Sequence, residues 1–124
     1  MISYQWSIFW ADLAPTRGSE QAGVRPVLVV SAEEANQALP VVTVLALTSM
    51  KPGRKVYSIE AFLPASLTGL PQDSLAMAHQ IRSIAKERLR GTCGSVRDEG
   101  LRANVRRAIE VYLGLREEQM PCLP

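Results

Sequence analysis

Short apolar runs alternate with polar, turn-forming segments along most of the chain. Six of these runs are rich in branched and aromatic residues, as β-strands are. Clusters of Pro, Gly and Asn separate them at residues 15–18, 36–40, 51–53 and 64–71 and favour turns. The pattern is typical of a small all-β barrel or sandwich rather than of strands alternating with long helices. The predicted strands cover residues 6–13, 26–31, 41–47, 56–62, 74–82 and 91–96.

One clear helix is predicted near the C-terminal end. Ser95 and Asp98 have the spacing of a capping box, and apolar residues then recur at steps of three and four from Leu101 to Tyr112, before Gly114. We expect this apolar stripe to pack on the barrel. The opposite face carries three arginines, for which a solvated surface is expected and RNA contact is the alternative: Arg102, Arg106 and Arg107.

Side chains alternate across a strand, so the predicted strand 74–82 has two distinct faces. We expect one face to belong to the core, with His79 partly buried and hydrogen-bonded there. On the other face we expect Gln80 and Arg82 to project together as a polar platform beside small residues. The core face is Leu75, Met77, His79 and Ile81, and the platform face is Ser74, Ala76, Ala78, Gln80 and Arg82.

Composition adds limits to this picture. The chain has 124 residues, which predicts one domain over residues 1–124, and its 47% apolar content with a net charge of only +2 excludes a disordered chain. No apolar run approaches the roughly 20 residues that span a bilayer. Residues 1–10 lack the basic start of a secretory signal, so the expected location is the cytoplasm.

Cysteine and histidine usage restricts the possible chemistry. Cys93 and Cys122 are far apart in sequence, so a zinc ribbon, a thioredoxin-type motif and a disulfide framework all lack their minimum parts. His79 is the only histidine, which excludes a two-histidine acid–base mechanism within one chain. No carboxylate cluster has the spacing to hold two metal ions. The composition is therefore compatible with a site that uses neither a metal nor a cofactor.

Charge is unevenly distributed along the sequence. Residues 1–50 hold four acidic and two basic side chains, whereas residues 51–124 hold eight acidic and twelve basic ones. A basic cluster suits a nucleic-acid groove, although a solvated face is the commoner explanation. The two clusters that stand out are Lys51 with Arg54 and Lys55, and Arg82 with Lys86, Arg88 and Arg90.

A long connection between the first two predicted strands, residues 14–24, is the first candidate for a functional loop, because loops of this length are often functional. Arg25 follows it and is held extended by Pro26 at the mouth of a buried strand. Thr48 and Ser49 place two hydroxyls where the third strand ends. An arginine with a hydroxyl nearby can hold a phosphate.

Residues 10–31 read W-A-D-L-x-P-x-x-G-S-E-Q-x-G-x-R-P-V-L-V-V-S. This element closely resembles the amino-terminal signature of the MazF/PemK family of toxin endoribonucleases and is the most specific part of the resemblance. The resemblance continues in Leu47-Thr48-Ser49 and in residues 80–89, and it covers nearly the whole chain. Trp6 and Ser7 stand where the family usually has a glycine and an acid, and Ala85 stands where an Asp is common.

The resemblance implies a fold and an activity. The implied fold is mainly β with a C-terminal helix, an SH3-like barrel that forms a homodimer. Such proteins cut single-stranded RNA without metal, in a groove along the dimer interface, through attack of the ribose 2′-hydroxyl on its own phosphate. The products are a 2′,3′-cyclic phosphate and a 5′-hydroxyl. By this resemblance Arg25 and Thr48 occupy the catalytic positions.

Recognition and inhibition follow from the same resemblance. Family membership implies a cognate antitoxin whose flexible acidic segment occupies the RNA groove, where basic side chains would meet it. Sequence-specific RNA readers hydrogen-bond splayed bases of single strands. The polar groups expected to bind RNA lie on the long loop, the end of the third strand and the platform: Ser19, Glu20, Gln21, Ser49, Gln80 and Arg82.

Two other functions remain open from the sequence, because a fold does not determine a function. The first is a non-catalytic toxin on the same scaffold that poisons DNA gyrase by binding it. The second is a small β-barrel interaction module whose basic clusters are ordinary surface. Neither needs Arg25 and Thr48 together, whereas an endoribonuclease does.

Overall fold

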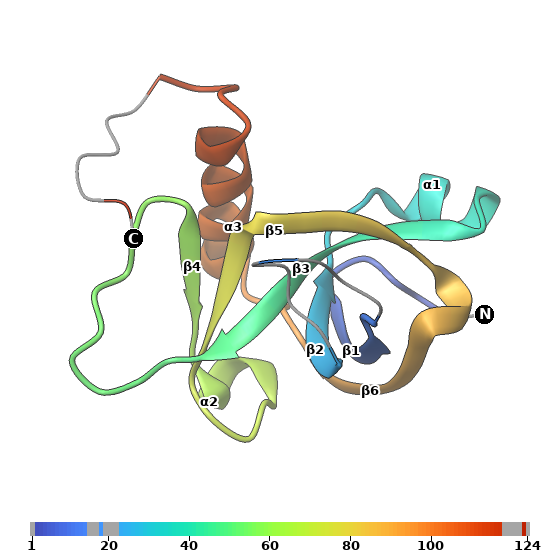
Figure 1. Ribbon diagram of the computed structural model, residues 1–124, viewed down its shortest axis with the longest axis horizontal. Coiled ribbons are helices and arrows are strands. Elements are labelled where there is room, and N and C mark those ends of the chain that lie inside the picture. The colour runs from blue at the N-terminus through green and yellow to red at the C-terminus, as the bar shows by residue number, and fades with distance from the viewer. Residues whose placement is uncertain (1, 15–17, 19–22, 118–122, 124) are drawn as a thin grey trace.

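Six strands and a C-terminal helix dominate the structure, a computed structural model that describes residues 2–14, 18, 23–117 and 123 (Figure 1). Two short helices and one 3-10 turn complete it. The strands are β1 (Ser7–Asp12), β2 (Val24–Val29), β3 (Val41–Ser49), β4 (Glu60–Leu63), β5 (Ser74–Ala85) and β6 (Leu89–Ser95). The helices are α1 (Glu33–Ala38), α2 (Ala65–Thr68) and α3 (Glu99–Tyr112), with the 3-10 turn η1 (Lys86–Arg88).

The strands form one antiparallel sheet in the order β4-β5-β3-β2-β1-β6. The long, curved β5 runs from β4 across to the turn before β6, and α3 packs on β4 and β5 (Figure 1). The predicted fold class, mainly β with a C-terminal helix, is confirmed. Neither short helix was predicted: α1 overlaps the turn expected at residues 36–40, and α2 lies within the one expected at residues 64–71. The fourth strand was predicted to begin four residues before β4 begins.

Both faces of the sheet bury apolar side chains. On β3, Leu45 and Leu47 point into a cluster with Leu28 and with Val105 of α3. The alternate β3 residues point into a second cluster with β1 and β2, made mainly of Val42, Val44, Ala46, Phe9, Val27 and Val29. The α3 stripe contributes Leu101, Val105 and Ile109 to the first cluster, as predicted, whereas Tyr112 is 43% exposed.

An irregularity in the pairing of β3 with β5 changes which side chains share a face. Val44 pairs with Arg82 and Ala46 pairs with Met77, so β5 advances five residues where β3 advances two. Met77 therefore joins the second cluster while Ile81 packs against the first. The predicted common face of Leu75, Met77, His79 and Ile81 is wrong, because the prediction assumed a regular pleat and irregularities of this kind break the alternation.

The same irregularity corrects the predicted platform. Ala76 packs in the first cluster, whereas Arg82 lies opposite Val44 of the second, so the small residue and the guanidinium are on different faces. His79 is half-buried, as expected, but its Nδ1 atom is buried without a hydrogen-bond partner.

The start of α3 also differs from its prediction. Asp98, not Ser95, is the N-cap, and its carboxylate accepts a hydrogen bond from the Leu101 N–H at 3.0 Å. Gly114 follows the helix with a φ of +71°, the left-handed conformation that the sequence predicted there.

Trp6 has a φ of 68° and is the only non-glycine residue with positive φ in the described ranges. A positive φ is uncommon for a bulky residue but easy for glycine. Glycine is the usual residue at this position in the family that the sequence resembles. The Trp6 N–H donates to the Val29 carbonyl, and the Trp6 carbonyl accepts from the Val96 N–H, both at 2.8 Å. Arg102 and Arg106, predicted to be solvated, each lie 5.2 Å from the Trp6 ring. They tie α3 to the start of β1.

Glu33 at the start of α1 anchors the N-terminal segment. Its carboxylate accepts hydrogen bonds from the N–H groups of Gln5 at 2.8 Å and Tyr4 at 3.1 Å, and from the side chains of Gln37 and Asn36. Burial alone would raise the pKa of Glu33, but these donors outweigh it and lower the pKa from 4.5 to about 2.

This carboxylate should make folding stability depend on pH. Because the folded-state pKa is lowered, Glu33 stabilises the fold fully above about pH 4.5 and loses that contribution as the pH falls toward 2. We expect Glu33→Gln to lower the free energy of unfolding at pH 7 by about 1 kcal/mol, given the partial exposure of the group. Urea unfolding across pH checks this, and a difference that persists unchanged at pH 2 would contradict it.

Candidate active site

A gap opens in the sheet where β2 and β3 separate. Their last paired residues are Val27 and Ala46, after which Val24–Pro26 stays paired with β1 and Leu47–Ser49 stays paired with β5. The pairing of β2 with β3 stops beside Pro26, which has no backbone N–H to donate. The two strand ends thus become the walls of a pocket.

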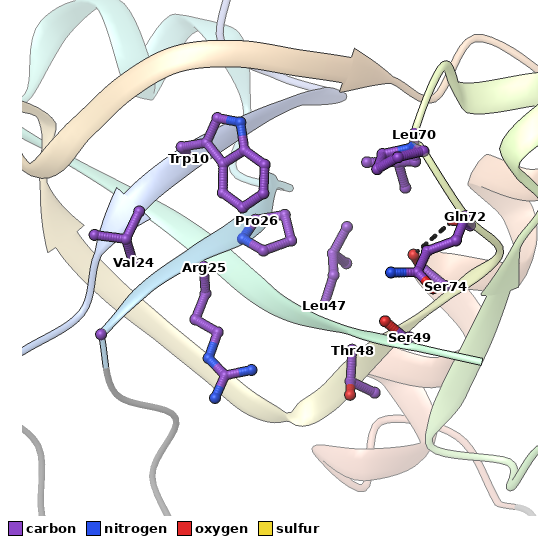
Figure 2. A pocket seen from close by; sticks show the side chains of 12 residues that line it. Trp10, Val24, Arg25, Pro26, Leu47, Thr48, Ser49, Leu70, Gln72 and Ser74 are labelled. Atoms are coloured by element: carbon purple, nitrogen blue, oxygen red, sulfur yellow. Dashed lines mark hydrogen bonds between the residues drawn. The ribbon is translucent and has the colours of Figure 1, made fainter. Parts of the chain in front are cut away.

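This pocket has a volume of about 450 Å³ and combines an apolar wall with polar groups (Figure 2). Its apolar part is formed largely by Trp10, Pro26, Leu47 and Leu70. Trp10 is 39% exposed, so an indole surface is open to a ligand. The complete lining is Trp10, Gly23, Val24, Arg25, Pro26, Leu47, Thr48, Ser49, Leu70, Pro71, Gln72 and Ser74.

Arg25 and Thr48 come from opposite walls of the pocket. Arg25 and Thr48 each lie two residues beyond Val27 and Ala46, the last residues that pair between β2 and β3. Because side chains alternate along a strand, both point to the same face of the sheet. Figure 2 shows the guanidinium and the hydroxyl extending to the same side of the two strands. The arrangement presents a forked cationic donor and a neutral hydroxyl to one space, which suits a phosphate group.

The other residues predicted from the sequence divide into three groups. Ser49 lines the pocket, opposite Ser74 in the β3–β5 ladder. Gln80 lies within the irregular stretch of β5 and Arg82 directly after it, and neither lines the pocket. Arg82 has a buried Nη1 atom without a hydrogen-bond partner. Residues 19–21, which include Ser19, Glu20 and Gln21, are outside the described part of the chain.

Sequence reasoning missed several lining residues. Trp10 opens the most specific element of the resemblance, but only its pairing with Pro26 shows that it lies beside Arg25. Gln72 and Ser74 follow a segment dismissed as a turn. Their signal was a polar residue just before β5 and another at its start, ahead of four apolar residues, 75–78. Ser74 is buried, with its hydroxyl donating to the Gln72 carbonyl at 3.0 Å.

The base of the long loop is held in place by the second basic cluster. Arg88 donates to the carbonyls of Ala14 at 2.8 Å and Asp12 at 3.3 Å, while Arg90 lies 3.7 Å from the Asp12 carboxylate. The Leu13 N–H donates to the Gly23 carbonyl at 2.9 Å and joins the two ends of the loop. Arg88 and Arg90 therefore support the strand next to the pocket.

Among the residues that the structure describes, no group of three or more His, Cys, Asp and Glu side chains could hold a metal ion. No helix in this part of the chain is long and apolar enough to cross a membrane.

The fold and the sequence both match one class of protein. The profile of the PemK-like, MazF-like toxins of type II toxin–antitoxin systems matches residues 4–113, and the chain therefore belongs to this family. Relatives include the endoribonuclease MazF9 of Mycobacterium tuberculosis, which is 42% identical over 113 residues, covering 87% of this chain and 93% of the relative. The endoribonuclease EndoA of Bacillus subtilis is 35% identical over 115 residues, covering 93% and 97%.

A solved structure agrees with these sequence matches. The MazE–MazF structure (form II) from Deinococcus radiodurans superposes with a TM-score of 0.70 and 26% identity, covering 94% of this chain and all of that one.

Proposed function

We propose that this protein is the toxin of a type II toxin–antitoxin system and acts as a sequence-specific, metal-independent endoribonuclease on single-stranded RNA. The observation that carries the proposal is the pocket between β2 and β3, to which Arg25 and Thr48 contribute from opposite walls. Family membership and the curated activity of two close relatives support it. The arginine and the hydroxyl are the groups that phosphodiester chemistry needs at this site.

The proposed reaction is an internal transfer at phosphorus. The ribose 2′-oxygen forms a bond to the adjacent phosphorus and loses its proton, while the bond from phosphorus to the 5′-oxygen of the next nucleotide breaks and that oxygen gains a proton. The products are a 2′,3′-cyclic phosphate and a 5′-hydroxyl. The transition state adds negative charge to the phosphoryl oxygens, so a positioned cation lowers the barrier.

Arg25 and Thr48 then have different roles. The Arg25 guanidinium clamps the phosphate and stabilises the developing charge. A guanidinium holds its proton too tightly to serve as a good general base. Thr48 donates to a phosphate oxygen or contacts the 2′-hydroxyl and maintains the in-line geometry. Both roles require the two side chains to face one space.

Recognition and partners form the second part of the proposal. Ser49 lines the pocket and is proposed to contact the nucleotide bound there. The residues proposed to read neighbouring bases are Ser19, Glu20, Gln21, Gln80 and Arg82. The protein is proposed to act in the cytoplasm as a homodimer inhibited by a cognate antitoxin. The MazE–MazF structure similar to this chain supports an antitoxin partner.

A cleavage assay tests the proposed function. Purified protein is incubated with single-stranded RNA containing every short sequence, in excess chelator, and the product ends are identified. We expect 2′,3′-cyclic phosphate and 5′-hydroxyl ends, and no cleavage when every 2′-hydroxyl is methylated, because the nucleophile is then blocked. Cleavage of the methylated RNA would contradict the chemistry. Gyrase inhibition without RNA cleavage would favour a gyrase poison, and inactivity in both assays an interaction module.

A further inference from the structure

A third side of the pocket is the segment between β4 and β5, residues 64–73, which includes α2. Figure 2 shows Leu70 and Gln72 of this segment across the pocket from Trp10 and Arg25. Leu70 is buried and also belongs to the first cluster, whereas Gln72 is exposed. The segment therefore gives the pocket one core side chain and one exposed amide.

Hydrogen bonds close this segment into one unit. The Asp73 carboxylate accepts from the Ala65 N–H at 2.9 Å, which joins the two ends of the segment. The Asp73 carbonyl accepts from the Met50 N–H at 2.8 Å, just after β3 ends. Inside the segment, the Thr68 hydroxyl accepts from the Leu70 N–H at 3.3 Å. A push on α2 is therefore passed on to the residues that line the pocket.

The end of α2 lies directly against the backbone of β6. Gly69, the residue after α2, has a φ of +81°, and a Cβ on it would lie 4.0 Å from the Cα of Gly94 on β6. A Cβ on Gly94 would lie 2.6 Å from the Thr68 carbonyl oxygen and 3.6 Å from Leu70 Cδ2. The first of these distances is too short for a carbon–oxygen contact, and the carbonyl is backbone that cannot rotate away. Because every other residue has a Cβ, α2 keeps this place only while position 94 is glycine.

Gly94 is needed for space and not for its own backbone conformation. Its φ is not positive, unlike that of Gly69. Gly91 lies on the same strand, also without a positive φ, and a Cβ there would have no atom within 4 Å. The two glycines of β6 therefore differ in what a side chain would meet, which is α2 at Gly94 and open space at Gly91.

We propose that Gln72 contacts the nucleotide bound in the pocket and that Gly94 positions Gln72, because the missing side chain lets α2 lie against β6. This inference rests on the proposed function, since the ligand of the pocket is taken to be RNA. A carboxamide has two donors and an acceptor and can hydrogen-bond to the edge of a base. Gly94 does not line the pocket, so it acts through α2 and Leu70.

Gly94→Ala and its control Gly91→Ala test the positioning role, because both add one methyl group to β6. In Gly94→Ala the contact with the Thr68 carbonyl must open from 2.6 Å to at least 3.0 Å, which displaces the segment. For the RNA that the native protein cuts best in a randomised single-stranded pool, we expect KM to rise about tenfold, as for one lost hydrogen bond. We expect kcat to stay nearly unchanged, because Arg25 and Thr48 belong to other strands. A native KM for Gly94→Ala, or an equal rise for Gly91→Ala, would overturn the inference.

A double-mutant cycle separates positioning from a general loss of stability. Gln72→Ala removes the exposed amide and keeps the carbonyl to which Ser74 donates. We expect Gln72→Ala alone to raise KM about tenfold and to change the bases preferred at the cut site. Gly94→Ala should then add little to KM in the Gln72→Ala background, because the group that it displaces is gone. Additive effects of the two substitutions on KM would refute the positioning role.

Thermal unfolding midpoints of the variants provide the check on folding. A lowered midpoint for Gly94→Ala with native KM and native site preference would reduce Gly94 to a packing residue. If Gly94→Ala does not fold, Thr68→Val replaces it in the cycle, because it removes the hydroxyl that holds the Leu70 N–H, and the same additivity criterion applies. If the native protein neither binds nor cuts RNA, the proposed function fails and this inference with it. If the native protein cuts RNA and the Gln72 variant matches it, only this inference fails.

Discussion

Arg25→Ala is expected to abolish RNA cleavage while RNA binding is weakened but retained. The guanidinium enters the pocket from β2 and is the group proposed to meet the phosphate as negative charge builds on it. Removing a preorganised donor of this kind costs about 10²- to 10³-fold in kcat, and a cationic arginine on a phosphoryl group supplies about 10³-fold or more. We therefore expect a loss of at least about 10³-fold.

Single-turnover cleavage of saturating RNA measures this loss without the contribution of binding. Arg25→Lys is the informative partner variant, because it keeps the charge and loses the two-pronged geometry. Its activity should fall between those of the native protein and Arg25→Ala. Near-normal turnover by Arg25→Ala, with the native fold intact by circular dichroism, would remove Arg25 from the mechanism.

Thr48→Val is expected to lower kcat by about 10²-fold with a small change in RNA affinity. The substitution keeps the branched shape that pairs with Leu75 on β5 and removes only the hydroxyl. The effect should therefore belong to the lost hydrogen bond rather than to packing.

Thr48→Ser provides the matched control for the hydroxyl. It retains the donor and should keep most of the activity, whereas loss of activity in both variants would point to the methyl group and to packing. Rates measured at saturating RNA for the three proteins, together with their thermal unfolding midpoints, separate the two explanations.

Much of the fold followed from local sequence signals. Apolar runs between Pro and Gly clusters predicted the strands, and the helical spacing of Leu101, Val105 and Ile109 predicted the face of α3 that packs on the sheet. The pocket that Arg25 and Thr48 both line had a local cause too, because Pro26 marks where β2 stops pairing with β3. The catalytic roles of these two residues stay predictions.

What sequence reasoning missed depends on long-range pairing. No local signal in β5 shows that it advances five residues where β3 advances two, so the face assigned to Ile81 was wrong. Arg54 was grouped with Lys51 and Lys55 in a basic cluster, but its partner Glu60 lies on a strand whose start was misplaced. Trp6 reveals its role only through its φ and the two arginines of α3 that contact it.

The separation of β2 from β3 has an evolutionary consequence. One wall of the pocket is supported by β1 and the other by β5, so substitutions beneath either support act on the width of the opening rather than on Arg25 and Thr48. In the proposed endoribonuclease, such substitutions offer a route to a changed choice of RNA sequence without replacement of the two side chains proposed to react.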